Sequence, residues 1–150
     1  MKDLRSSITD KIFRAIHTGE GALPWSVQGV ENPAAGATIT NPTPVSVELI
    51  GEIFYLPYIV PMGHVLVILD MHIGTDATAG VQAHLKLKVT GGGYTNVTIR
   101  DLIKYNEPAH ESHETCLWIP EGYSLRVDLT NASAAAIYIR YLVSGILVKI

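Results

Sequence analysis

Histidine and carboxylate side chains that could bind a metal ion lie close together in the segment PAHESHET. The candidate ligands are His110, His113 and Glu114, and imidazole and carboxylate groups are common ligands of zinc and iron. Metalloenzymes of jelly-roll fold need a His-x-His pair with a glutamate on one strand, but no His-x-His sequence occurs in this chain. His110 and His113 are three residues apart, which suits one face of a helix rather than a strand, and Pro108 favours a loop. We therefore expect a solvated loop here, with a metal site as the alternative.

Nucleophilic and phosphate chemistry have little support in the sequence. There is no Gly-x-Ser-x-Gly turn, and Cys116 is followed by Leu117 and Trp118, so a buried strand thiol is expected rather than an activated thiolate. The glycines at 91–93 lie between two predicted strands, so they indicate a hairpin turn and not a phosphate-binding loop at a helix start. No pair of carboxylates stands out as the acid and nucleophile of a glycosidase. We expect a protein without enzymatic activity and without a cofactor.

The composition is that of an ordinary folded domain. The 150 residues are 47% hydrophobic and 17% charged, compared with about 25% charged in an average soluble protein. That balance excludes intrinsic disorder, and a net charge of −3 argues against a nucleic-acid partner. A single cysteine excludes an intrachain disulfide, and no apolar run is long enough to cross a membrane. The first residues lack the apolar centre of a secretory signal, so we expect a soluble protein made in a reducing cytoplasm.

Alternation of apolar and polar residues predicts antiparallel strands from Val45 to the end of the chain. The clearest examples are VQAHLKLKV and YSLRVDLT. The other runs are VSVELI, EIFYLPYIV, HVLVILDMHI, YTNVTIRDLI, ETCLWI and AAIYIRYLVSGILVKI. Turn residues separate about eight strands, no helical pattern interrupts them, and the turns at Pro61 and Pro120 share the order Pro-x-Gly. We predict an all-β domain over residues 45–150, in the form of an eight-stranded antiparallel jelly-roll sandwich.

Residues 1–44 follow a different pattern. An apolar residue recurs every fourth position at the start, which predicts a short amphipathic helix. The residues of this stripe are Leu4, Ile8, Ile12 and Ile16, with Phe13 beside them. Residues 18–44 are rich in Gly, Pro, Ala, Thr and Asn, carry little charge and show no lasting period, so we interpret them as an extended arm. Trp25 in this arm has no obvious core to enter, which favours a role as an anchor on another chain.

Two segments are apolar on both faces, which an antiparallel sheet with one solvated face does not explain. They are HVLVILDMHI and the final YLVSGILVKI. Both faces of such strands need cover, and the simplest cover is another subunit. We therefore predict a homo-oligomer, with a cyclic trimer as the expected form.

The whole plan, a short helix, a low-charge arm and a β domain, resembles the trimeric jelly-roll decoration (cement) proteins on the heads of tailed bacteriophages. The passages that carry the resemblance are IFRAIHTGEGALPW, WIPEGYSLRVDLTNAS and the apolar C-terminal run. The resemblance implies a non-enzymatic clamp on the outer surface of the virion capsid, made in the host cytoplasm. Its partners are then the major capsid protein and sister copies in a homotrimer, with no nucleic acid and no membrane.

In this interpretation the helix and arm order on binding and cover a large surface of the partner. The expected partner-binding residues, for the capsid or a neighbouring subunit, are Leu4, Ile8, Ile12, Phe13, Ile16, Leu23 and Trp25, with Lys11 and Arg14 setting the orientation on an acidic shell.

Three alternatives remain open. The helix and arm could instead fold back on their own domain or cross to a sister subunit. The chain could also be the receptor- or carbohydrate-binding head of a tail fibre or baseplate, acting through loops 74–80, 91–94 or 104–114. As a third alternative, the chain could be a cupin-like metalloprotein.

Overall fold

The computed structural model describes residues 4–49, 52–76, 80–105, 109–111 and 117–150, and for residues 4–7 and 109–111 it describes the backbone alone. The elements in chain order are α1 (Leu4–Thr18), β1 (Ala22–Glu31), β2 (Thr38–Thr40), β3 (Ser46–Glu48), β4 (Tyr58–Ile59), β5 (His64–Thr75), β6 (Ala83–Gly91), β7 (Tyr94–Lys104), β8 (Ala109–Glu111), β9 (Leu117–Ile119), β10 (Ser124–Asn131) and β11 (Ile139–Lys149).

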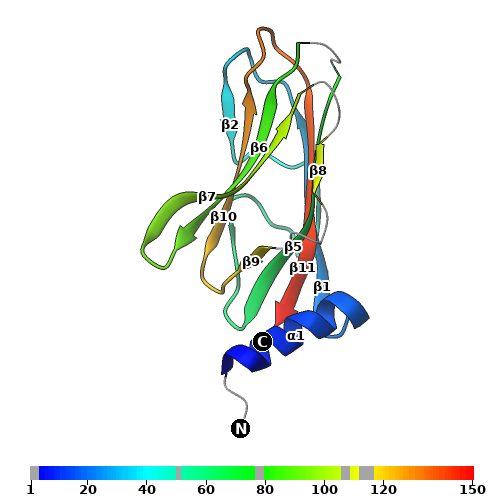
Figure 1. Ribbon diagram of the computed structural model, residues 1–150, viewed down its shortest axis with the longest axis vertical. Coiled ribbons are helices and arrows are strands. Elements are labelled where there is room, and N and C mark those ends of the chain that lie inside the picture. Colours follow the sequence, from blue (N-terminus) through cyan, green and yellow to red (C-terminus); the bar gives the residue numbers. More distant parts are fainter. Residues whose placement is uncertain (1–3, 50–51, 77–79, 106–108, 112–116) are drawn as a thin grey trace.

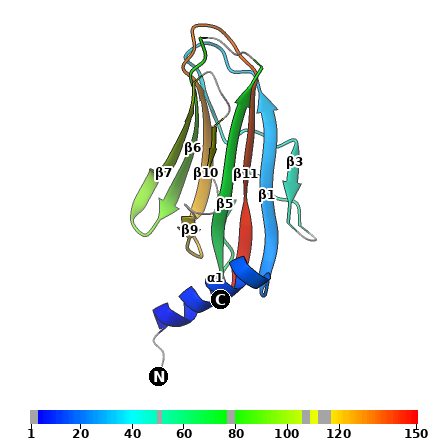
Figure 2. The ribbon, with the colours of Figure 1, turned by 45° about the vertical axis from the view of Figure 1, so that its right-hand side comes forward.

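Two antiparallel sheets pack face to face, and α1 lies at one end of the sandwich (Figures 1 and 2). Sheet A has six strands in the order β3-β1-β11-β5-β8, with β9 also paired to β5. Sheet B has five strands in the order β2-β10-β6-β7, with β4 also paired to β10. The expected all-β fold is confirmed. The expected count of eight strands is not, because short strands such as β2 and β4, of three and two residues, complete the sheets.

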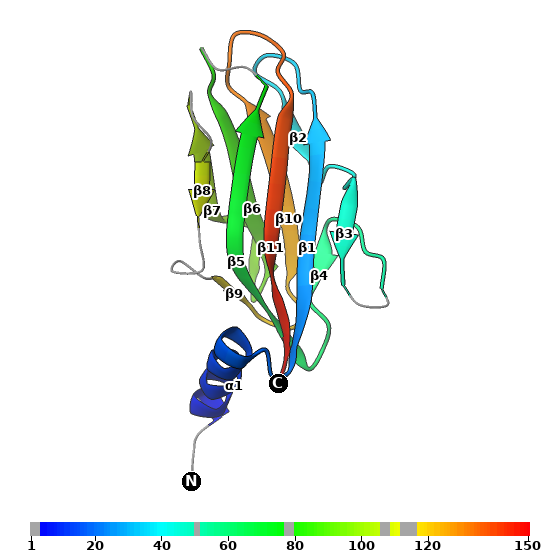
Figure 3. The same ribbon diagram turned by 90° about the vertical axis from the view of Figure 1, so that its right-hand side faces the viewer.

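Strand β1 is the largest departure from the sequence-based prediction. It pairs with β11 over its whole length, from Ala22 opposite Val148 to Glu31 opposite Ile139, and with β3 on its other edge (Figure 3). The expected arm over residues 18–44 is therefore wrong for this segment. The expected division into a helix and arm (1–44) and a β domain (45–150) is also wrong, because β1 and β2 each add a strand to one of the two sheets.

The inward residues of β1 explain why its alternation is hard to see in the sequence. Trp25 and Val27 are buried, with 1% and 0% exposure. The next inward position is Gly29, where a Cβ atom would lie 2.9 Å from Cε1 of Tyr141. The ring of Tyr141 takes the space that a side chain at position 29 would fill. This inward position therefore holds glycine, and the alternation of apolar residues along β1 is interrupted there.

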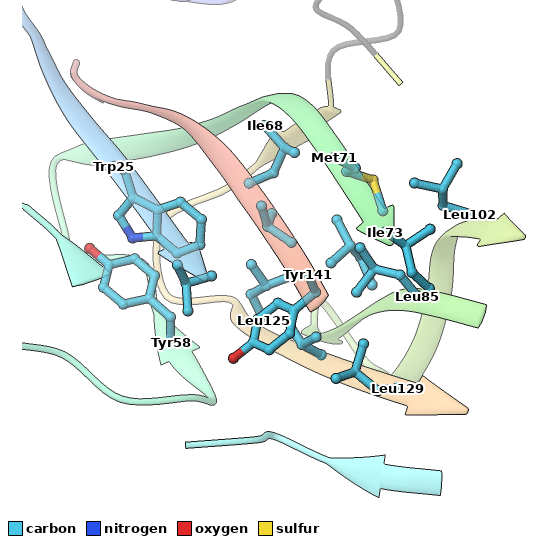
Figure 4. Close-up of a cluster of buried hydrophobic side chains, with 14 of the residues drawn as sticks. Trp25, Tyr58, Ile68, Met71, Ile73, Leu85, Leu102, Leu125, Leu129 and Tyr141 are labelled. Atoms are coloured by element: carbon cyan, nitrogen blue, oxygen red, sulfur yellow. The ribbon is translucent and has the colours of Figure 1, made fainter. Parts of the chain in front are cut away.

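The core between the sheets is apolar (Figure 4). Trp25 stacks on Phe54 with ring centroids 5.2 Å apart. The ring of Tyr58 lies beside Trp25 in Figure 4, and their ring centroids are 5.4 Å apart. The fully buried residues that sheet B contributes from β6 and β10 include Leu85, Leu87, Leu125, Val127 and Leu129. The alternation predicted for VQAHLKLKV and YSLRVDLT is therefore confirmed, with the apolar residues facing the core.

Helix α1 covers part of the outer face of sheet A. Ile12 and Ala15 are buried against Val65 and Val67 of β5 and Val148 of β11. The partly buried residues around this contact are Ile8, Ile16, Ala22, Leu69, Ile146 and Ile150. This contact accounts for strands that are apolar on both faces, because their cover here is the helix of the same chain. The homotrimer therefore remains a prediction that these strands no longer support.

Strands β5 and β11 contain a β-bulge, where their register shifts between Ser144 and Gly145. Gly145 approaches β5 so closely that a Cβ atom there would overlap the carbonyl oxygen of Val67. Packing therefore requires glycine at this position, since the backbone of β5 cannot move aside as a flexible side chain would.

Candidate functional site

The histidine segment lies at an edge of sheet A. His110 is in β8, where it pairs with His72 of β5 in the register of the sheet. The expected solvated loop is therefore a short strand at this point, while His113, Glu114 and Cys116 lie outside the described residues. Among the residues that the structure describes, no three His, Cys, Asp or Glu side chains lie together as metal ligands would.

Asp128 carries a buried carboxylate on the outer face of sheet B, with a side chain 3% exposed. Its oxygens accept hydrogen bonds from Nε of Arg126 at 2.8 Å and Nη2 of Arg126 at 3.2 Å, and Nζ of Lys88 lies 3.0 Å away. Burial alone raises the pKa of Asp128, but the hydrogen bonds from Arg126 and Lys88 outweigh it and hold that pKa below its ordinary value of 3.8. Arg126 also donates to the hydroxyl of Thr40 on β2, so this cluster joins β2, β6 and β10 and has a structural role.

We expect Asp128→Asn to lower the free energy of unfolding by about 2 kcal/mol near pH 7, because two cations then face a neutral amide. Since the folded pKa lies below the unfolded one, this stabilisation is complete above about pH 4 and is lost as the pH falls through the folded pKa. Urea unfolding of both proteins from neutral to acid pH measures it, and the difference between them should shrink in acid. Glu48→Gln, at an exposed position of β3, is the control. A difference that does not change with pH would contradict this assignment.

The structure divides the expected partner-binding residues into buried and exposed sets. Ile12 is buried between α1 and sheet A, and Trp25 lies in the core, so the expectation that they contact a partner is corrected. Ile8 and Ile16 pack on sheet A beside Ile12. The exposed members are Lys11, Phe13, Arg14 and Leu23, and Leu4 is described by its backbone alone. The helix and β1 thus fold back on their own domain, which was one of the alternatives.

The solvent-facing residues of α1 lie on two sides of the helix. Successive residues turn by about 100° around the axis, so Phe13 and Lys11 point in nearly opposite directions. Phe13 is 63% exposed, and its ring centroid lies 4.3 Å from that of His17. Lys11 and Arg14 line a cavity of about 310 Å³ between α1 and the end of β11. The helix therefore presents one aromatic side and one basic side.

Trp118 is an exposed aromatic residue on β9. It pairs with Val67, so both side chains point to the outer face of sheet A, where α1 also lies. Trp118 is 46% exposed, while Ile119 beside it is 1% exposed. The alternation in LWI, with isoleucine inward, is the signal that could have placed the tryptophan outward. We call Phe13, His17 and Trp118 the aromatic surface.

Comparisons with known proteins do not assign the chain to a family. No family model matches it, and neither does any curated protein. It is similar to the crystal structure of Drosophila NLP-core, which provided insight into pentamer formation and histone binding. The two chains are 14% identical, the match covers 80% of this chain and 98% of that chain, and the TM-score is 0.39. Similarity at this level indicates neither a shared function nor a shared partner. In the described part of this chain, no helix has the length and apolar character needed to span a membrane.

Proposed function

We propose that this protein is a non-enzymatic decoration protein of a tailed-phage capsid, which binds the outer surface of the shell as a homotrimer. The jelly-roll connectivity of the family that it resembles is part of this proposal. The observation that carries it is Phe13, an aromatic side chain 63% exposed on a helix whose opposite face is buried in its own domain. An exposed phenylalanine contributes little to the stability of the helix. Its burial by a partner protein would be favourable.

The aromatic surface has the composition of the centre of a protein interface. Aromatic side chains bring a large contact area with few rotatable bonds, and they are frequent among the residues that dominate binding energy. The ring of Phe13 already packs against His17, so little side-chain freedom is lost when a partner binds.

The mode of binding differs from the clamp that the resemblance implies. Because α1 is packed on sheet A, it would bind as part of a rigid body and not as an arm that becomes ordered on the shell. Such binding avoids the entropy cost of ordering a flexible segment. Three copies of this contact on one trimer would act together through their high effective concentration.

Binding to empty capsid shells that lack the protein tests this function. We expect the wild-type protein to sediment with the shells, and the variant with Phe13→Ser and Trp118→Ser to bind at least about 100-fold more weakly, because two aromatic anchors are lost. Tyr138→Ser is the matched control, since Tyr138 is 51% exposed beside the start of β11, at the end of that strand far from α1. It should bind like the wild type. Failure of the wild-type protein to bind any shell would overturn the proposal.

A receptor- or carbohydrate-binding head is the second candidate, because exposed tyrosines lie in two of the loops expected to act in that case. Tyr94 is 68% exposed at the β6–β7 hairpin, and Tyr105 is 60% exposed after β7. Rings with a polar end are well suited to such contacts. Binding to host cells that is lost with Tyr94→Ser and Tyr105→Ser, but kept without Phe13 and Trp118, would favour this function instead.

A further inference from the structure

An apolar and acidic surface runs along the edge of the sandwich formed by β3 and the segment that leads to β4. Val45, Ile53 and Tyr55 are 76%, 81% and 68% exposed. Glu48 and Glu52 are exposed in the same segment, and the sequence from Val45 to the end of β4 contains no lysine, arginine or histidine. We call Val45, Glu48, Glu52, Ile53 and Tyr55 the β3 flank.

Core residues fix the β3 flank in place. Leu49 and Phe54 are buried between its exposed residues, and Phe54 packs against Trp25 and Tyr58 with ring centroids 5.2 and 4.9 Å apart. The backbone N–H of Glu52 donates to the carbonyl of the buried Leu49 at 2.9 Å. Burial, and to a smaller extent the negative charge of Glu52, raises the pKa of Tyr58 to about 12. The carboxylate of Glu52 therefore lies near the buried ring of Tyr58. The apolar side chains of the flank are therefore exposed from a segment anchored in the core.

The opposite charge gathers in the cavity between α1 and β11. This cavity of about 310 Å³ is lined by Lys11, Arg14, Glu20, Gly21, Lys149 and Ile150. Three of the lining side chains are positive and one is negative, so the cavity carries a net positive charge. The backbone N–H of Lys149 donates to the carbonyl of Gly21 at 3.2 Å, which joins the end of β11 to the turn that follows α1. We call this the helix-end cavity.

We propose that the β3 flank of one copy binds at the helix-end cavity of a second copy, with its two glutamates opposite Lys11, Arg14 and Lys149. The charges are complementary, which fixes the orientation of the contact, and the three apolar residues of the flank supply area that charge pairs alone do not. β3 lies at one edge of sheet A, whereas α1 lies below the other side of that sheet (Figure 3). The two surfaces thus belong to different parts of one copy, and we place the contact between two molecules.

A contact between two different surfaces of identical chains is heterologous. Such contacts close into a ring when the rotation between neighbours divides a full turn, and the trimer expected from the sequence is one such ring. The contact uses the basic side of α1 and leaves Phe13 and Trp118 free. The subunit contact therefore does not depend on binding of the protein to a shell.

Charge reversal with rescue tests this contact. In sedimentation-velocity experiments the wild type should form an oligomer. Glu48→Lys with Glu52→Lys, and separately Lys11→Glu with Arg14→Glu, should each raise the dissociation constant at least about 100-fold, because like charges then meet. The protein with all four substitutions should associate again, since its charges are exchanged and not lost. Asp76→Lys, exposed after the end of β5 that is far from α1 and outside both surfaces, should leave the oligomer unchanged.

Three outcomes would overturn the proposal: a monomeric wild type, an oligomer that neither pair of reversals weakens, and a four-substitution variant that stays monomeric. Circular dichroism of each variant checks that these substitutions, all at exposed positions, leave the fold intact. The variant with Phe13→Ser and Trp118→Ser should keep the oligomer. Its failure to bind shells is therefore distinguishable from failure of the subunit contact.

Discussion

Replacing Gly145 by alanine is expected to destabilise the protein by about 4 kcal/mol. A Cβ atom at this position would overlap the carbonyl oxygen of Val67 on β5. The overlap is with backbone, so it is relieved only if β5 and β11 move apart, and both are interior strands of sheet A. For a chain of this length, the loss lowers the melting temperature by roughly 10 °C, which thermal circular dichroism measures.

Gly74→Ala is the matched control, because Gly74 lies in the same strand pair, opposite Arg140. A Cβ atom there would meet only Nε2 of His72, at the ordinary contact distance of 3.6 Å. We expect this substitution to change stability by less than about 1 kcal/mol. Equal destabilisation by the two alanines would mean that the close approach of Gly145 to Val67 is not the cause.

Trp25→Ala should lower the free energy of unfolding by about 3 to 5 kcal/mol, because it removes the largest side chain of a close-packed region and leaves a cavity. Trp25 is 1% exposed and stacks on Phe54, whereas Trp118 is 46% exposed. Trp118→Ala makes the same change at the surface and should cost about 1 kcal/mol or less. Guanidinium unfolding compares the two. An unchanged unfolding midpoint for Trp25→Ala would mean that β1 is not part of the core, and would restore the arm interpretation.

The sequence predicted the elements in which every second residue is apolar, but it could not identify what covers them. β6 and β10 alternate strictly, and both lie where that alternation placed them. The stripe of Ile8, Ile12 and Ile16 likewise predicted a helix with one buried face. Burial of apolar area has no preferred direction, so the stripe fits a foreign shell and the outer face of sheet A equally well. Only the fold shows that Val65 and Val148 provide the cover.

The candidate surfaces were harder to predict because they depend on residues far apart in the chain. The helix-end cavity brings Lys11 and Arg14 next to Lys149, and no local pattern links these positions. Ile53 and Phe54 are adjacent, yet one is 81% and the other 8% exposed. An apolar residue type alone does not distinguish a core side chain from one at an interface. Strand β1 was missed for a different reason, since Pro24 and Gly29 hide its period of two.

The pairing of β1 with β11 also constrains how the chain folds during synthesis. Ala22 leaves the ribosome long before its partner Val148, and α1 cannot complete its contact with sheet A until that valine has emerged. Strands whose partners are distant in sequence pair slowly, and unpaired apolar segments aggregate while they wait. The nascent chain therefore cannot complete the burial of Ile12 until β11 is translated. During that interval the exposed apolar side chains of α1 are a site at which the nascent chain can aggregate.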